Sequence, residues 1–174
     1  MNGLFLGGAK MKKNFVFITL FTILIFIVSC GGNDSDGIKW SALSSNEMIW
    51  QDALDYCENL NEDGYSNWRL PNINEMRTLI QNCPGSQAGG TCAVSDPDHL
   101  ASSDNWSDGC ECESTADNGG YYSKIGDDDT VSPWSSSSRS DDTERAWFVG
   151  FFNGSIRNSQ KTVTSDVRCV RNVE

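Results

Sequence analysis

The chain has 174 residues, a length typical of one domain. Its 13 lysines and arginines stand against 24 aspartates and glutamates, a net charge of -11 that repels phosphate backbones, so no nucleic acid partner is expected. With 38% hydrophobic residues, including six tryptophans and eight phenylalanines, the composition excludes a disordered chain and predicts a modest hydrophobic core.

The first 29 residues have the pattern of a targeting segment. Lys12 and Lys13 precede an apolar run of 14 residues, Phe15–Val28. That run is shorter than the roughly 20 residues of a membrane-spanning helix and fits the hydrophobic region of a secretory signal peptide. It ends in Ile-Val-Ser-Cys, which resembles the bacterial lipobox, so Cys30 is the predicted site of lipid attachment. An uncleaved N-terminal anchor is the less favoured alternative.

Residues 30–37 are expected to form a flexible tether, and residues 38–174 the mature domain. Three lysines and no acid precede Cys30, so the chain from Cys30 onward carries 10 cations against 24 acids, a net charge of -14. Gly31 stands where some lipoproteins carry an aspartate that retains them at the inner membrane. We therefore expect a secreted, lipid-anchored protein at the outer membrane or the cell surface.

Six cysteines remain once the lipid-attached one is set aside. An even number outside the cytoplasm predicts three disulfides. Their spacing lacks the paired two-residue gaps of zinc sites and the chain has one histidine, so zinc is the less favoured alternative. The six are Cys57, Cys83, Cys92, Cys110, Cys112 and Cys169.

Two amphipathic helices are predicted in the first half of the chain. The first is expected to begin near Asn46, with Ser45 or Asn46 as its cap, and to end at residues 61–64. Asn72 with Glu75 three positions later predicts a capping box at the start of the second. The apolar stripes are Trp50, Ala53, Leu54, Cys57 and Leu60 in the first, and Ile73, Met76, Leu79 and Ile80 in the second.

The second half combines a long loop with predicted strands. Residues 82–120 are polar, Gly-rich and hold four cysteines, which indicates a loop braced by cross-links. An early strand is predicted at Ile38–Ser41, and Ala146–Phe152 with the turn signal Asn153-Gly154 predicts a hairpin. Helices first and main strands last predict an α+β fold with an antiparallel sheet. The further strands of the expected meander are Ser155–Arg157, Thr162–Thr164 and Val167–Val170.

Five blocks of the mature chain together resemble the Lcl C-terminal domain family, named for the Legionella collagen-like adhesin. They are Trp50–Cys57, Asn67–Met76, Pro133–Ser136, Ala146–Val149 with Asn153-Gly154, and Arg168–Arg171. The resemblance extends from about Trp40 to Arg171. It implies a C-type-lectin-like fold in which two helices flank a short antiparallel sheet, the chain ends lie close together and long loops are disulfide-braced.

The resemblance also implies a disulfide between the first helix and the final strand, which here is Cys57 with Cys169. Three pairings of the remaining four cysteines stay open, and Cys83–Cys92 with Cys110–Cys112 is the one we favour, although a bridge across one residue is strained.

No enzymatic activity is expected. The Trp-Arg-Leu-Pro block, Trp68–Pro71, also resembles the formylglycine-generating enzymes, which use a cysteine pair near the C-terminal end. Here Cys169 is alone in the C-terminal third, so kinship of fold is implied but activity is not. His99 is the only histidine and lies in an acidic loop, and no serine is marked out by a nearby base. A related enzyme is the third-ranked function.

Exposed aromatic rings are the first candidates for binding a glycan, because sugar faces pack on rings and nearby polar groups fix the hydroxyls. Trp106, Tyr121, Tyr122 and Trp134 stand among polar residues and are these candidates, with exposure and burial equally expected for Trp106 and Trp134. Trp50, Trp68 and Trp147 lie in patterned blocks and are expected in the core.

A structural calcium ion is the one cofactor for which the sequence offers ligands. The C-type-lectin motifs Glu-Pro-Asn and Trp-Asn-Asp do not occur, so no metal is expected at the ligand site. The acids in question are Asp96, Asp98, Asp104, Asp108 and Asp127–Asp129.

A basic segment, Arg139–Arg171, is the second ligand candidate, since it holds six cations against four acids. The family's namesake is associated with sulfated glycosaminoglycans, and a face containing Arg145 and Arg157 is the counterpart here. Ordinary strand surface charge is the slightly favoured alternative. The sequence thus predicts a non-catalytic, adhesin-like surface lipoprotein that binds an extracellular glycan or a surface protein. A structural envelope module is the alternative.

Overall fold

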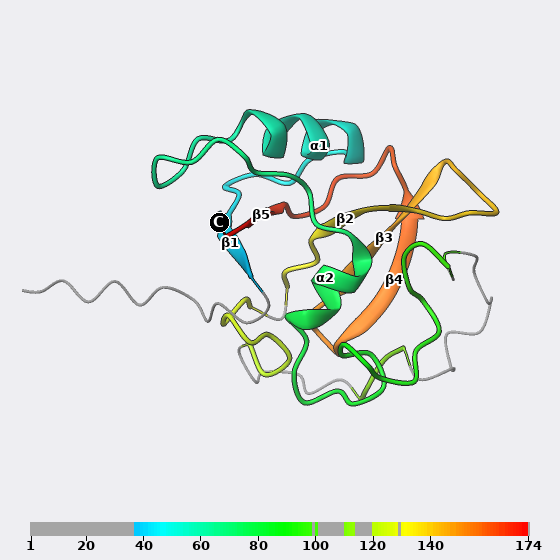
Figure 1. Ribbon diagram of the computed structural model, residues 1–174. Helices are drawn as coiled ribbons and strands as arrows, with labels where there is room; N and C mark the ends of the chain where they lie inside the picture. Colours follow the sequence, from blue (N-terminus) through cyan, green and yellow to red (C-terminus); the bar gives the residue numbers. More distant parts are fainter. Residues whose placement is uncertain (1–36, 99, 101–109, 114–119, 129, 174) are drawn as a thin grey trace, which may run out of the picture. The chain divides into compact units, whose positions relative to one another are not determined.

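The computed structural model describes residues 37–98, 100, 110–113, 120–128 and 130–173, within the compact unit Gly31–Glu174 (Figure 1). The predicted signal peptide and Cys30 lie outside the described residues. Among those described, neither helix is long and apolar enough to cross a membrane. The elements are β1 (Ile38–Leu43), α1 (Trp50–Asn59), α2 (Ile73–Thr78), β2 (Trp134–Ser138), β3 (Arg145–Gly150), β4 (Ser155–Gln160) and β5 (Arg168–Asn172).

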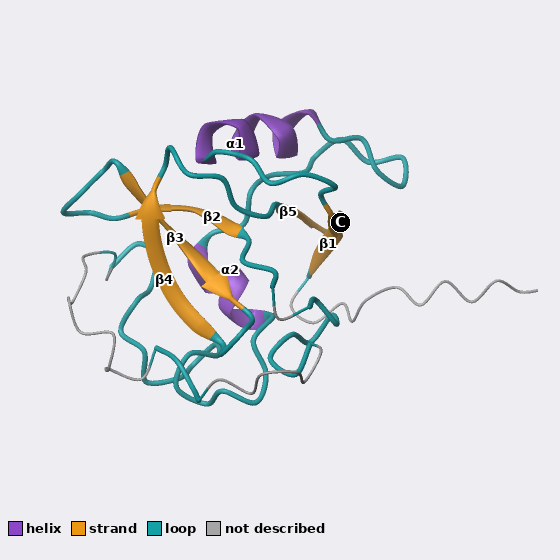
Figure 2. Ribbon diagram, turned by 180° about the vertical axis from the view of Figure 1, so that it is seen from behind, coloured by secondary structure: helices purple, strands orange, loops and turns teal. Residues whose placement is uncertain are grey.

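The strands form two antiparallel sheets, which confirms the α+β class (Figure 2). Strands β2, β3 and β4 form a three-stranded sheet with β3 in the middle, and β1 pairs with β5 in a second sheet. Lys39 lies opposite Arg171 in the β1–β5 pair. The Val173 N–H donates to the Gly37 carbonyl at 2.7 Å, so the two ends of the described domain meet.

Helix α2 begins with the predicted capping box. The Asn72 side chain accepts from the Glu75 N–H, and the Glu75 carboxylate accepts from the Asn72 N–H, both at 2.9 Å. These two bonds satisfy backbone donors that a helix start would otherwise leave unpaired, which is why so short a helix has a fixed beginning.

Helix α1 begins four residues later than predicted and has no side-chain cap, since Ile49 is its N-cap residue. The chain before it is extended, because Met48 pairs with Ser165 through two backbone hydrogen bonds of 2.8 and 3.0 Å. Pairing with a distant segment therefore overrides the local preference for helix. Of the predicted stripe, Ala53 and Cys57 are buried.

The C-terminal strands depart from the predicted meander. The β3–β4 loop has four residues, Phe151–Gly154, since Gly150 pairs with Ser155. Phe151 is fully buried there, and a Cβ on Gly154 would lie 2.9 Å from the Cys83 Cβ, so packing dictates both the longer turn and the glycine. Residues 162–164 are exposed and form no strand. The final strand then pairs with β1 instead of β4.

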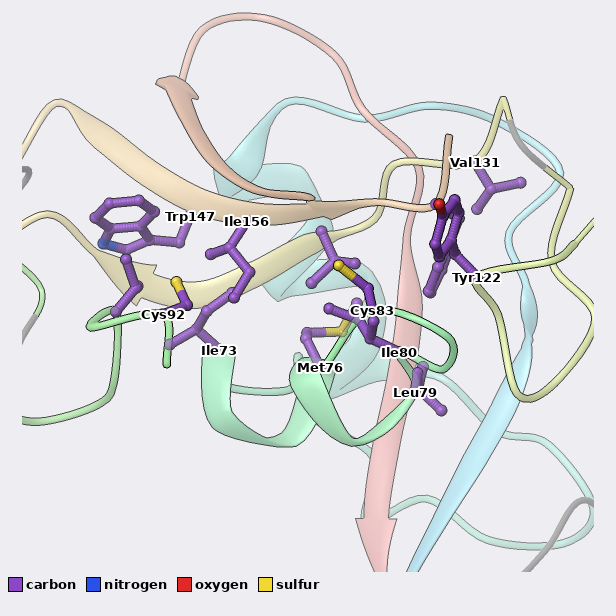
Figure 3. Close-up of a cluster of buried hydrophobic side chains, with 13 residues drawn as sticks. Ile73, Met76, Leu79, Ile80, Cys83, Cys92, Tyr122, Val131, Trp147 and Ile156 are labelled. Carbon is purple, nitrogen blue, oxygen red and sulfur yellow. The ribbon is translucent and has the colours of Figure 1, made fainter. Parts of the chain in front are cut away.

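The main core lies between α2 and the inner face of the three-stranded sheet (Figure 3). Ile73 and Met76 point from the helix toward Trp147 and Ile156, and all four are buried. Burying side chains of this size contributes roughly 1.5–3 kcal/mol each. The predicted α2 stripe, which includes Leu79 and Ile80, is confirmed as core.

A second core cluster joins α1 to the two sheets. It contains Ala53, Cys57, Trp134, Val167 and Cys169 among its buried residues. The Cys57–Cys169 disulfide, whose partners are 112 residues apart in sequence, crosses this cluster. It is the pairing that the family resemblance implies.

The favoured pairing of the loop cysteines is wrong. The disulfides join Cys83 to Cys112 and Cys92 to Cys110. Residues 110–112 lie along the β3–β4 hairpin, because the Ile156 N–H donates to the Cys110 carbonyl at 2.8 Å and the Cys112 N–H to the Asn153 carbonyl at 2.9 Å. This docking carries both cysteines to the segment that follows α2, and it avoids a bridge across one residue.

Arg77 organises the start of the long loop from the inside. Its buried guanidinium donates to the carbonyls of Ser86 (2.9 Å), Val94 (2.7 Å) and Gln87 (3.1 Å). Burial lowers the pKa of Arg77. Because its N–H groups bond carbonyls along this segment, Arg77 holds together a part of the chain that has little apolar core of its own.

Candidate ligand-binding site

The structure buries two of the aromatic rings that the sequence offered to a ligand. Trp134 is fully buried on β2, where its indole N–H donates to the Met48 carbonyl at 3.0 Å, and Tyr122 is 3% exposed. The expected exposure of Tyr122 is therefore wrong, and Trp134, for which exposure and burial were equally expected, is buried. Tyr121 is 43% exposed and contacts Tyr122 edge-on, and Trp106 lies outside the described residues.

Among the tryptophans predicted to be core, Trp68 and Trp147 are confirmed as buried, at 3% exposure each. Trp50 is half-buried. Its indole N–H donates to the Ser135 carbonyl at 2.8 Å, and the Lys161 ammonium lies 3.8 Å from its ring centre.

The two arginines of the predicted basic face do not come together. Side chains alternate along a strand, so Arg145 shares a face with Trp147, whereas Arg157 lies opposite Phe148 and projects from the other face. Both are engaged within the domain. The Arg145 Nε donates to the Asn158 amide oxygen at 2.6 Å, and Arg157 pairs with Glu111 at 3.1 Å.

Further cations of the Arg139–Arg171 segment also have acidic partners. Arg139 pairs with Asp141 at 2.8 Å, and Arg168 pairs with the buried Asp127. Burial raises the pKa of Asp127, against the opposing effects of Arg168 and a Ser123 hydrogen bond.

The calcium candidates that are described do not form a cluster. No group of three or more His, Cys, Asp or Glu side chains that could hold a metal occurs among the described residues. Asp127 is occupied by Arg168, while Asp104, Asp108 and Asp129 lie outside the described part of the chain.

A depression of about 490 Å³ lies at the end of β5, where Val173 of its lining bonds Gly37 at the start of the described domain. Its rim is formed by exposed residues of the segment Gly64–Asn67 and by Val173. Arg171, which is only 5% exposed, forms its floor. The lining thus combines an exposed aromatic ring, that of Tyr65 at 45% exposure, with an amide, a hydroxyl and a guanidinium.

Local structure fixes Tyr65 over Arg171. Gly64 adopts a left-handed φ of 80° in a turn that is closed by backbone hydrogen bonds between Glu62 and Tyr65. The Trp68 indole N–H donates to the Tyr65 carbonyl at 3.0 Å. The Arg171 guanidinium carbon then lies 3.5 Å from the Tyr65 ring centre and 5.5 Å from that of Trp68, a cation–π arrangement.

The chain that follows the rim segment Gly64–Asn67 is tied to α2 by an ion pair. Arg69 makes two hydrogen bonds to the Glu75 carboxylate, at 2.6 and 2.7 Å. Burial acts to raise the pKa of Glu75, but the bonds from Arg69 and the Asn72 N–H outweigh it, so the pKa is lowered. Arg69 is also held by Val170, with which it exchanges backbone hydrogen bonds of 2.9 and 2.8 Å. The capping box of α2 thereby positions the segment that carries Tyr65.

The lining of the depression carries an aromatic ring, an amide, a hydroxyl and a guanidinium. Cys169, the cysteine compared with those of the formylglycine-generating enzymes, is bonded to Cys57 and is not a free thiol. The depression offers stacking, hydrogen bonding and one positive charge.

The sequence did not single out this site. Tyr65 follows a glycine turn assigned only as the end of a helix, and Arg171 was one of six cations in a segment. A solitary tyrosine beside a turn glycine was the available signal, but its exposure depends on tertiary contacts.

Similarity to known proteins covers nearly all of the described domain. No curated protein matches the chain. A family model described as the Lcl C-terminal domain matches residues 32–171, which is 140 of the 174 residues. The match includes both helices, the three disulfides and the Tyr65–Arg171 depression. The chain therefore belongs to the Lcl C-terminal domain family.

Proposed function

We propose that the protein is an adhesin-like surface lipoprotein whose C-type-lectin-like domain binds an extracellular glycan, without catalysis, in the Tyr65–Arg171 depression. The observation that carries the proposal is the exposed Tyr65 ring held over a polar floor. Membership of the Lcl C-terminal domain family supports an adhesin-like surface role.

The lining suits a sugar ring. The exposed part of Tyr65 offers an apolar surface to the C–H face of a pyranose. Asn67 provides an amide that both donates and accepts, and Ser66 provides a hydroxyl, so both can bond sugar hydroxyls. A shallow, polar depression with one ring is suited to a single sugar unit of a longer chain.

The lipid anchor is supported by the lipobox at Cys30 and by the cysteine count. The other six cysteines are all consumed in three disulfides, which form and persist outside the cytoplasm. Cys30→Ala should abolish labelling of the protein by a fatty acid fed to growing cells. Labelling of the variant at the wild-type level would disprove lipidation at this residue.

Glycan binding is tested with the full-length protein, purified in detergent from a disulfide-forming host, on an array of neutral, acidic and sulfated glycans. The array is run with calcium and with a chelator, which also tests the calcium proposal. Tyr65→Ala should remove most binding. Tyr121→Ala is the matched control, since it deletes a tyrosine of nearly equal exposure elsewhere and should bind as the wild type does.

Two results would overturn the proposal. Equal binding by the Tyr65→Ala variant and the wild type would place the ligand elsewhere on the domain. Absence of binding to every glycan, with a fixed protein neighbour found by cross-linking in intact cells, would establish an envelope assembly module instead.

A further inference from the structure

Arg171 is a buried cation without a carboxylate partner among the described residues. Its Nη1 donates to the Asn172 carbonyl at 3.2 Å, and its Nε is buried with no hydrogen-bond partner. Burying a charged group without a counter-charge is costly, and folds rarely retain such a group unless something pairs with it.

Within the described part of the chain, the charged side chains around Arg171 leave one positive charge uncompensated. Lys39 lies directly opposite Arg171 across the β1–β5 pair, and like charges at such positions repel. The exposed Asp63 forms an ion pair with Lys39 at 3.5 Å, and Glu75 forms one with Arg69 at 2.6 Å. The Glu62 carboxylate in the same turn accepts from the Ala42 N–H at 2.9 Å, so none of these three described acids pairs with the cation on the floor of the depression.

From this we infer, on the basis of the proposed function, that the depression takes a sugar acid: a hexuronate unit whose carboxylate binds Arg171 while its ring packs on Tyr65. The guanidinium lies against the Tyr65 ring, so an anion can meet it along its edge and not at that face. The edge of a guanidinium matches a planar carboxylate, with two parallel N–H···O bonds.

The charge balance favours one carboxylate over a densely sulfated polymer. A single uncompensated cation is neutralised by a single carboxylate. A polysulfate carries more charge per sugar unit than a polyuronate, so the net charge of -14 of the chain from Cys30 onward repels it more strongly beyond the depression. Sulfate and carboxylate share the ability to bind arginine, so the experiment must separate them.

The test is titration of the full-length, detergent-purified protein with oligogalacturonate, with its methyl ester and with dextran sulfate. The ester keeps the sugar ring and removes the charge. Wild-type protein should bind the acid roughly tenfold or more tightly than the ester, because the ester leaves the buried guanidinium unpaired. Dextran sulfate should bind more weakly than the acid at physiological salt.

Arg171→Gln should lose the preference for acid over ester, and Arg171→Lys should retain part of it, since lysine keeps the charge but not the two-pronged geometry. Lys124→Gln is the control, because it removes one exposed cation outside the depression and should leave the preference intact. Thermal melting checks the fold of each variant. If Arg171→Gln does not fold, the inference is tested by the Arg171→Lys variant and by the ratio of acid to ester affinity in the wild type.

The possible failures are distinguishable. Equal affinity for acid and ester, with both lost in Tyr65→Ala, would overturn the inference and leave glycan binding in place. If dextran sulfate binds more tightly than the acid and Arg171→Gln does not change this, the anion binds to a diffuse charged surface and not to Arg171. If short peptides with a free C-terminal carboxylate compete more strongly than the sugar acid, the ligand is a protein and not a sugar. No binding of any probe would overturn both proposals.

Discussion

Arginines on the two antiparallel sheets differ in the partners that meet their charge. On the three-stranded sheet, Arg145 bonds Asn158 at 2.6 Å and Arg157 pairs with Glu111 at 3.1 Å. On the two-stranded sheet, Arg168 pairs with Asp127, whereas Arg171 lies under the Tyr65 ring with no carboxylate partner among the described residues. The segment that contains all four has a small net positive charge, which fails to distinguish them.

This difference teaches that the partner of a cation, more than its place in a basic segment, decides whether it is available to a ligand. Arg77 sharpens the point, since it too is buried without a carboxylate. Its donors are met by backbone carbonyls, including those of Ser86 and Val94. Arg77 is therefore a structural residue, whereas Arg171 has bonding capacity to spare.

The largest expected effect comes from removing the bridge that fixes the two-stranded sheet. Replacing Cys57 and Cys169 together by alanine frees a chain of 112 residues, which should cost about 5 kcal/mol in the chain-entropy model. Replacing Cys92 and Cys110 frees 18 residues and should cost about 3 kcal/mol. Urea unfolding of the two double variants measures both. A larger loss for the shorter loop would show that strain or core packing, not loop closure, sets the order.

The second prediction compares the two buried arginines as Arg77→Met and Arg171→Met. The first leaves several buried carbonyls unpaired and should cost about 3 kcal/mol of unfolding free energy. The second loses mainly the cation–π contact with Tyr65 and should cost about 1 kcal/mol or less. The folded Arg77→Met variant should still prefer oligogalacturonate to its ester. Equal stability losses would mean that Arg171 is as structural as Arg77.

Local features of the fold were predictable from the sequence, because short-range chemistry determines them. The capping box of Asn72 and Glu75 needs only neighbours three residues apart. The apolar stripe of α2 and the strand around Trp147 follow from periodicity. The Cys57–Cys169 bridge came from the family resemblance, which carries three-dimensional information that spacing alone lacks.

Long-range contacts were what the sequence did not contain. Strand β2 was not predicted, because it lies in a serine-rich stretch. In the structure the Ser135 hydroxyl donates to the Trp147 carbonyl, which permits burial of this stretch with Trp134 beside it. The loop disulfides follow from docking on the β3–β4 hairpin. The exposure of Tyr65 depends on the Gly64 turn and on Arg171, which is more than a hundred residues away.

The third prediction concerns the ion pair between Arg69 and Glu75. The lowered pKa of Glu75 means that its contribution to stability is present above its unfolded pKa, near 4.5, and is lost as the pH falls through the lower folded value. Glu75→Gln should therefore lower the unfolding free energy at pH 7 by about 1 kcal/mol, through the weaker cap and the lost pair with Arg69. The gap should close on acidification. A constant gap between pH 7 and pH 3 would contradict the assignment.

The smallest expected effect tests whether the field around Arg171 extends across the two-stranded sheet. Lys39 is partly exposed and already paired with Asp63, so it should contribute to oligogalacturonate binding only through long-range attraction. Lys39→Gln should weaken binding by about two- to threefold at low salt and have no effect at high salt, where the screening length is a few ångströms. Lys124→Gln provides the comparison. A salt-resistant loss in Lys39→Gln would mean that Lys39 contacts the carboxylate directly, and the sugar acid would then be held between two cations instead of one.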